Sequence, residues 1–131
     1  MGNVAVVQGI YDAFRTGDLP GIFGAMHPDI EWNEAENYPY AVTNPHIGPE
    51  AILAGVFGQI AGDWDGFAAK PDQILDAGDH VVALGRYSGV AKATGTAMDA
   101  QFAHVWRLVD GKVASFQQYA DTLQTARALG R

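Results

Sequence analysis

The chain has 131 residues, a length typical of one domain, and we expect a single domain over residues 1–131. Its formal net charge is −7 and its lysines and arginines form no cluster, which argues against nucleic acid as a partner because phosphates would repel such a chain. Cysteine is absent, which excludes disulfides, thiol catalysis and thiolate metal sites.

The first half of the chain predicts two helices followed by a strand. Apolar residues at helical spacing predict a helix over residues 3–16. Asp18 is placed to cap a short second helix, which His27-Pro28 should end. Residues 30–34 then read as a strand. The Pro- and Asn-rich segment that follows, through residue 49, is long enough to act as a lid.

A third helix over residues 48–62 precedes a change to a period of two. Asp110-Gly111 is a dipeptide typical of type I′ hairpins, and Asp121 is placed to cap a short terminal helix. Alternation predicts four strands, over residues 73–77, 80–90, 97–109 and 112–120. This order predicts an α+β domain whose helices cover one face of an antiparallel sheet and leave a conical pocket.

Two stretches of the chain carry a resemblance to a known superfamily. They are VVQGIYDAFRTGDLPGIFGAMHPDIEW, residues 6–32, and FAHVWRLVDGKVASFQQYADTLQTARALG, residues 102–130. Both resemble the nuclear transport factor 2-like superfamily, which includes ketosteroid isomerase, scytalone dehydratase and the SnoaL-like polyketide cyclases. The resemblance implies a cone-shaped, curved antiparallel sheet wrapped around three N-terminal helices, also called cystatin-like, with a short C-terminal helix. It also implies a homodimer.

The resemblance places the family's functional positions on residues of this chain. The general-base Asp of ketosteroid isomerase falls on Glu34, which keeps a carboxylate. The oxyanion-hole Tyr of that enzyme falls on Ile10, beside Tyr11, and its oxyanion-hole Asp falls on His104. A His of the polyketide cyclases is matched by the same His104, whereas their catalytic Asp falls on Gln118.

Alternation along the strands predicts which side chains share the pocket with His104. On the strands of the second half these are Phe102, Trp106, Leu108, Leu84, Arg86, Ser88, Phe116, Gln118 and Ala120, and the first strand adds Trp32 and Glu34. Aromatic walls are then expected from Trp32, Phe102, Trp106 and Phe116, with a polar set of Glu34, Arg86, His104 and Gln118. Apolar walls with a few convergent polar groups are typical of a small-molecule pocket.

Each polar residue has a chemical role and a structural alternative. Burial would raise the pKa of Glu34 towards that of a general base, or Glu34 is a solvated residue at the pocket lip. His104 would donate to an enolate oxygen or act as the acid partner of Glu34, or it is a satisfied core histidine. Arg86 would form a bidentate pair with Glu34 or bind an acidic substrate, and Gln118 would orient the ligand.

Three interpretations of function remain open. The first is a small enzyme without a cofactor, an isomerase or lyase, in which Glu34 removes a proton beside the carbonyl of an apolar compound and His104 stabilises the oxygen. The second is a non-catalytic small-molecule-binding domain with a structural Glu34–Arg86 ion pair. The third is a hydrolase or dehydratase with His104 as the base. The residues leave open whether the chain is an enzyme at all.

Other partners and sites are argued from missing motifs and from the outer face of the sheet. The 4 histidines have no metal-binding spacing, and no Gly-rich phosphate motif follows a strand, so neither a metal nor a cofactor is expected.

No apolar run approaches the ~18 residues of a membrane span, and the N-terminus lacks signal-peptide features, which predicts a soluble, cytoplasmic protein. A partly apolar outer face predicts a homodimer through Val105, Arg107, Val109, Gln117 and Tyr119.

Overall fold

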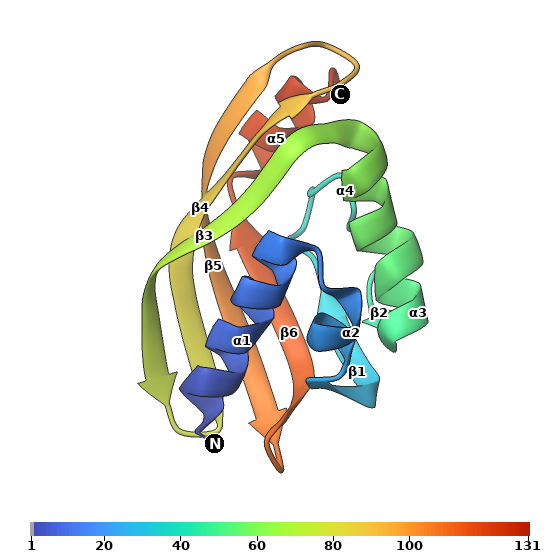
Figure 1. Ribbon diagram of the computed structural model, residues 1–131. Coiled ribbons are helices and arrows are strands. Elements are labelled where there is room, and N and C mark those ends of the chain that lie inside the picture. Colours follow the sequence, from blue (N-terminus) through green and yellow to red (C-terminus); the bar gives the residue numbers. More distant parts are fainter. Residues whose placement is uncertain (1) are drawn as a thin grey trace.

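One six-stranded sheet forms the framework of the computed structural model, which describes residues 2–131. The strands lie in the order β2-β1-β6-β5-β4-β3. Figure 1 shows three helical segments on one face of this curved sheet and a fourth at its end. They are α1 (Asn3–Thr16), α2 (Leu19–Phe23) and the run from α3 (Pro49–Ile52) to α4 (Gly58–Asp63), with α5 (Thr122–Ala128) at the end. The strands are β1 (Met26–Asn33), β2 (His46–Ile47), β3 (Trp64–Ala77), β4 (His80–Ala91), β5 (Ala97–Val109) and β6 (Lys112–Ala120).

The two opening helices form where the sequence predicts them. Helix α1 (Asn3–Thr16) has the predicted bounds, and Gly17 ends it in the left-handed region at φ 72°. Helix α2 (Leu19–Phe23) is capped by Asp18, whose carboxylate accepts the backbone N–H of Gly21 at 3.0 Å. The predicted extension of α2 to His27-Pro28 is wrong, because the backbone from Ala25 onwards pairs with β6 instead.

The third predicted helix and the strand after it both differ in detail. The helix runs as α3 (Pro49–Ile52), a π-helical turn (Leu53–Phe57) and α4 (Gly58–Asp63). Strand β3 begins at Trp64, well before the predicted start at residue 73. Its pairing with β4 shifts register twice, and each bulge moves the side chains to the other face. That interruption hides the period of two in the sequence.

The C-terminal hairpin and helix follow the predicted pattern. Asp110 and Gly111 both have positive φ, 52° and 76°, as a type I′ turn between β5 and β6 requires. Helix α5 (Thr122–Ala128) begins after Asp121, whose carboxylate accepts the Gln124 N–H. No helix within residues 2–131 is both long and apolar enough to cross a membrane.

The predicted α+β architecture is confirmed, with one difference in the direction of a strand pair. Strand β1 runs parallel to β6, with Trp32 opposite Phe116, so the sheet is mixed; the other strand pairs are antiparallel. The core fills the space between the helices and the inner face of the sheet. Its fully buried members include Val7, Ile22, Ile30, Ile52, Val56, Val81 and Trp106.

Candidate functional site

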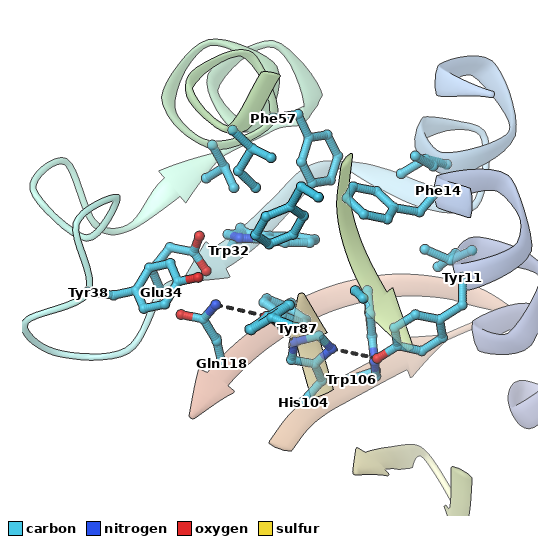
Figure 2. Close-up of a pocket in the computed structure, with 17 residues that line it drawn as sticks. Tyr11, Phe14, Trp32, Glu34, Tyr38, Phe57, Tyr87, His104, Trp106 and Gln118 are labelled. Atoms are coloured by element: carbon cyan, nitrogen blue, oxygen red, sulfur yellow. Dashed lines mark hydrogen bonds between the residues drawn. The ribbon is translucent and has the colours of Figure 1, made fainter. Parts of the chain in front are cut away.

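A cavity lies between the helices and the inner face of the sheet. Its interior offers about 50 Å³ of space to a water-sized molecule, and it opens to the solvent. Its walls are mostly aromatic, and its polar groups come from five elements that are distant in the sequence (Figure 2). The walls include Phe14, Trp32, Phe57, Phe67, Trp106 and Phe116, and the polar side chains are Tyr11, Glu34, Tyr38, Tyr87, His104 and Gln118.

Six of the eight side chains that the sequence predicts as the aromatic walls and the polar set of the pocket line this cavity. Trp32, Glu34, His104, Trp106, Phe116 and Gln118 all line it. Phe102 is buried beside it and stacks on His104, with 3.9 Å between ring centroids, but it does not line the cavity. The chemical roles of these residues stay predictions.

Arg86 does not belong to the cavity, and the predicted inner face of β4 is wrong by one residue. Its guanidinium donates to Asp99 at 2.7 Å on the outer face, where the Arg86 side chain is 51% exposed. Side chains that stand opposite each other in an antiparallel pair share a face. Because Ala83 stands opposite His104, the inward residues of β4 are Val81, Ala83, Gly85 and Tyr87, while Leu84, Arg86 and Ser88 face outwards. The predicted Glu34–Arg86 ion pair therefore does not form.

Glu34 follows directly after β1 and carries a buried carboxyl group. The residue is 3% exposed, and no ion pair or side-chain hydrogen bond involves its carboxyl group within residues 2–131. Burial raises the pKa of Glu34 to about 8, because a charged carboxylate is poorly solvated there. The nearby indole N–H of Trp32 acts against this rise, although its geometry falls short of a hydrogen bond.

The backbone of Glu34 is fixed by the loop that covers it. Asn44 accepts the Glu34 N–H at 3.1 Å and donates to the Glu34 carbonyl at 2.8 Å. The same loop buries Tyr38 and Tyr40, and the Tyr40 hydroxyl donates to Asp63 at 2.9 Å. The loop that the sequence predicts as a lid is thus attached to β1 on one side and to the end of α4 on the other.

His104 stands at the centre of a buried hydrogen-bond chain. Its Nδ1 lies 2.5 Å from the Tyr11 hydroxyl and its Nε2 lies 2.5 Å from the Tyr87 hydroxyl. The Trp106 indole donates to Tyr11 at 3.1 Å, and the Gln118 amide donates to Tyr87 at 2.9 Å. Figure 2 shows the residues of this chain along one side of the cavity.

These contacts change the role that His104 can play. Burial lowers its pKa to about 3, so the imidazole is neutral near neutral pH. Both ring nitrogens are already hydrogen-bonded, which leaves neither free to reach a ligand. The direct acid or donor role of His104 stays a prediction, and His104 holds the hydroxyls of Tyr11 and Tyr87 in place beside the cavity.

Two further polar atoms beside the cavity have no partner. Within residues 2–131, Trp32 Nε1 and the Tyr38 hydroxyl are the buried side-chain nitrogen and oxygen atoms without a hydrogen bond. Thr125 and Gln118 lie close enough to lower the pKa of Tyr38 slightly against the rise caused by burial, without reaching hydrogen-bond geometry. Unpaired buried donors are costly, and they are commonly found where a ligand or water binds.

The sequence reasoning missed Tyr38 and Tyr87 as cavity residues. Tyr87 was hidden because residues 80–90 are apolar on both faces, so alternation alone does not say which face is inner. The β4–β5 register would have revealed it, since Tyr87 stands opposite the buried Ala100. No local pattern marks Tyr38, which lies in the loop. Within residues 2–131 no three His, Asp or Glu side chains gather as a metal site requires.

The fold and the enclosed cavity define a small α+β domain of the nuclear transport factor 2-like, or cystatin-like, class. Residues 7–116 match the family model for the SnoaL-like domain, and the chain belongs to that family. No curated protein matches the chain.

Solved structures agree with this assignment along the whole chain. A nuclear transport factor 2-like protein from Burkholderia thailandensis is 35% identical, with 98% of each chain covered and a TM-score of 0.94. One of unknown function from Burkholderia pseudomallei is 27% identical, with 100% of each chain covered and a TM-score of 0.90. TerC, co-crystallised with polyporic acid, is 26% identical, with 98% of each chain covered and a TM-score of 0.87.

Proposed function

We propose that this protein is a small enzyme that moves a proton on an apolar carbonyl compound without a cofactor. Glu34 removes the proton next to the carbonyl, and a tyrosine hydroxyl held by His104 donates to the oxygen that becomes negative. The aromatic walls pack on the apolar body of the substrate. The reaction class is isomerisation or cyclisation through an enolate.

The observation that carries this proposal is the state of the Glu34 carboxyl group. It lies at an aromatic cavity, has no cation beside it within residues 2–131, and has a pKa raised by burial to about 8. A general base works best when its pKa lies near the operating pH, and burial without an ion pair produces that value. A Glu34 paired with Arg86 would have had a lowered pKa and little power as a base.

The neutral hydroxyls supply the second requirement of the reaction. An enolate needs a hydrogen-bond donor that is already in place before the charge develops. Tyr11 and Tyr87 keep their protons because burial raises the pKa of both hydroxyls. Both are held by His104, so the donor does not have to reorient during the reaction.

Two alternatives make different predictions. A hydrolase or dehydratase with His104 as base is disfavoured by the hydrogen bonds on both ring nitrogens and by its lowered pKa. A non-catalytic binding domain needs only the aromatic cavity, and the co-crystal of TerC with polyporic acid supports binding of a small organic molecule in this fold. Binding without turnover is the outcome that separates this alternative from the enzyme.

The test is proton exchange on a simple enolisable ketone. We expect the protein to catalyse deuterium uptake from D₂O into 2-tetralone at the carbons next to the carbonyl, followed by ¹H NMR. Glu34→Gln should slow this uptake by on the order of 100-fold or more. Glu31→Gln, at an exposed glutamate on the preceding strand β1, should not.

The pH profile adds an independent check on Glu34. A base must be deprotonated to act, so kcat/KM should rise with pH and level off above about 8. Full exchange by Glu34→Gln contradicts the base role. Saturable binding of 2-tetralone by the wild-type protein with no exchange at any pH favours the binding domain.

A further inference from the structure

The hydrogen bonds on both sides of His104 form a continuous chain, and the hydrogen atoms in it can be counted. The chain runs from the Trp106 indole through Tyr11, His104 and Tyr87 to the Gln118 amide and contains four hydrogen bonds. The backbone N–H of Ala35 donates to Gln118 Oε1 at 3.1 Å, which turns the amide nitrogen of Gln118 towards Tyr87. Both ends of the chain are therefore donors.

The five residues offer one hydrogen more than the four hydrogen bonds between them need. Trp106, Tyr11, His104 and Tyr87 contribute one hydrogen each, since a neutral imidazole carries a single N–H, and Gln118 contributes the one of its two amide hydrogens that points to Tyr87. Four hydrogen bonds consume four of these five hydrogens. The remaining one must sit on a tyrosine: on Tyr87 if the imidazole hydrogen is on Nε2, or on Tyr11 if it is on Nδ1.

We propose that the imidazole hydrogen of His104 is on Nε2 and that the surplus hydrogen belongs to the Tyr87 hydroxyl, which donates it to the oxygen of the bound ligand. In this arrangement Tyr87 accepts from both Gln118 and His104 and is left with its own hydrogen to donate. Tyr11 accepts from Trp106 and donates to Nδ1, so it has nothing left for a ligand. His104 acts here as a positioning residue.

The surroundings of the Tyr11 and Tyr87 hydroxyls favour Tyr87 as the residue that carries the surplus hydrogen. The Tyr87 hydroxyl is linked to the backbone of Ala35, the residue after Glu34, by the Gln118 amide alone. The Tyr87 ring also lies 6.4 Å from that of Tyr38, between centroids, on the lid side of the cavity. Burial raises the pKa of Tyr87, and the negative charge of an ionised Glu34 raises it further. Glu34 is not among the causes of the raised pKa of Tyr11. Figure 2 shows Glu34 on the Gln118 side of His104 and Tyr11 on the other side, and the carboxyl oxygens of Glu34 accept no side-chain hydrogen bond within residues 2–131.

The consequence for the reaction concerns the distance between base and donor. The carbonyl oxygen of a ketone and the hydrogen on its neighbouring carbon are only a few bond lengths apart. The base and the oxygen donor must therefore stand close together on the same side of the cavity. Hydrogen bonds link Tyr87 through Gln118 to Ala35, the residue after Glu34, whereas Tyr11 is bonded to the opposite ring nitrogen of His104. This step rests on the proposed function, but the position of the hydrogen does not.

Neutron diffraction from a deuterated crystal of the ligand-free protein tests the position of the hydrogen directly. We expect one deuterium on Nε2 of His104, none on Nδ1, and the Tyr87 hydroxyl deuterium pointing out of the chain into the cavity. A deuterium on Nδ1, two deuteriums on the ring, or a Gln118 amide turned the other way overturns the proposal. The result does not depend on any substrate.

A pair of matched variants tests the consequence for the ligand. Tyr87→Phe should slow deuterium uptake into 2-tetralone by about 100-fold, the usual loss for one oxyanion donor. Tyr11→Phe should slow it by less than about 10-fold, and Tyr119→Phe, on the exposed outer face, should leave it unchanged. With saturating 2-tetralone, ¹⁵N NMR should still show the hydrogen of His104 on Nε2.

The two experiments separate two kinds of failure. If 2-tetralone is neither bound nor exchanged by the wild-type protein, the proposed function fails, and the neutron structure still decides the position of the hydrogen. If the wild-type protein exchanges it and Tyr11→Phe loses more than Tyr87→Phe, the proposed function stands and the role assigned to Tyr87 is wrong.

Discussion

Glu34 is a residue whose chemistry conflicts with its surroundings. The residue is 3% exposed and lies beside aromatic rings. Within residues 2–131 no cation pairs with its carboxyl group. A core position of this kind is usually apolar, because an unpaired charge there destabilises the fold. Keeping the carboxyl neutral avoids most of that cost at lower pH. Ionisation of Glu34, which the proposed base role requires, therefore lowers the stability of the fold at higher pH.

The stability cost of Glu34 should depend on pH in a defined window. The folded state has a pKa of about 8 and the ordinary value is 4.5, so the folded protein binds a proton that the unfolded chain releases between these values. The free energy of unfolding then falls as pH rises through this window, by at most about 1.4 kcal/mol per pH unit. Glu34→Gln removes this slope. Urea unfolding at pH 5, 6.5 and 8 should show the variant gaining on the wild type as pH rises.

The exposed Glu31 provides the control for this measurement. Glu31→Gln should show a difference from the wild type that stays constant over the same pH values. If the gain of Glu34→Gln does not grow between pH 5 and 8, the Glu34 carboxyl is solvated or paired in solution, and its role as a raised-pKa base fails with it.

At the scale of elements, the loop over residues 34–45 is held to the backbone of Glu34 and carries buried tyrosines. Asn44 makes two hydrogen bonds to the backbone of Glu34, and Tyr38 and Tyr40 are buried under the same loop. Val42, by contrast, is 89% exposed at its outer side. The loop is thus held by the Asn44 hydrogen bonds and by the buried tyrosines, and we expect the burial of Glu34 to depend on these contacts.

Removing the Asn44 contacts should loosen the loop and change the pKa of Glu34. We expect Asn44→Ala to lose about 1–3 kcal/mol of stability, because the two hydrogen bonds disappear. Water reaching Glu34 should also lower its pKa towards 4.5, so the pH profile of exchange should level off at lower pH than in the wild type. Val42→Ala, in the same loop, should change neither quantity. A destabilised Asn44→Ala with an unaltered pH profile would show that other residues keep Glu34 dry.

Strand β4 shows where element-scale reasoning from the sequence fails. Residues 80–90 carry apolar side chains at both odd and even positions, since Leu84 and Val82 face outwards while Val81 and Ala83 face inwards. A period of two predicts a strand there but not its inner face. Alternation therefore predicts Arg86 on the inner face, whereas in the structure Arg86 faces outwards and Tyr87 faces inwards. The inner face is decided by the register with β5.

At the scale of the whole molecule, the outer face of the sheet remains partly apolar. Tyr119 is 57% exposed and Val109 is 39% exposed, while the helices cover only the inner face. A sheet face that is neither covered nor fully polar favours contact with another copy of the chain. The homodimer through Val105, Arg107, Val109, Gln117 and Tyr119 stays a prediction of the sequence.

Sedimentation velocity tests that interface. We expect a dimer at concentrations on the order of tens of micromolar, and a shift towards monomer in Tyr119→Glu, because a buried charge without a partner opposes association. Leu123→Glu, which is 58% exposed on α5, serves as the control and should leave the dimer intact. A wild-type monomer at these concentrations, or equal effects of the two variants, contradicts the predicted interface.

The sequence by itself determined the features that depend on short-range physics. The bounds of α1, the Asp18 and Asp121 caps and the Asp110-Gly111 turn each depend on a few neighbouring residues, and all are found in the structure. The inward placement of Glu34, His104 and Gln118 followed from alternation together with the family resemblance.

Only the tertiary structure decided which polar groups meet. Arg86 and Glu34 lie apart, while Tyr11, His104 and Tyr87 come together from α1, β5 and β4. Such contacts depend on strand register and on the packing of helices against the sheet, which join residues more than 90 positions apart. The pKa values of Glu34 and His104 follow from that packing, because burial is a property of the assembled core and not of the local sequence.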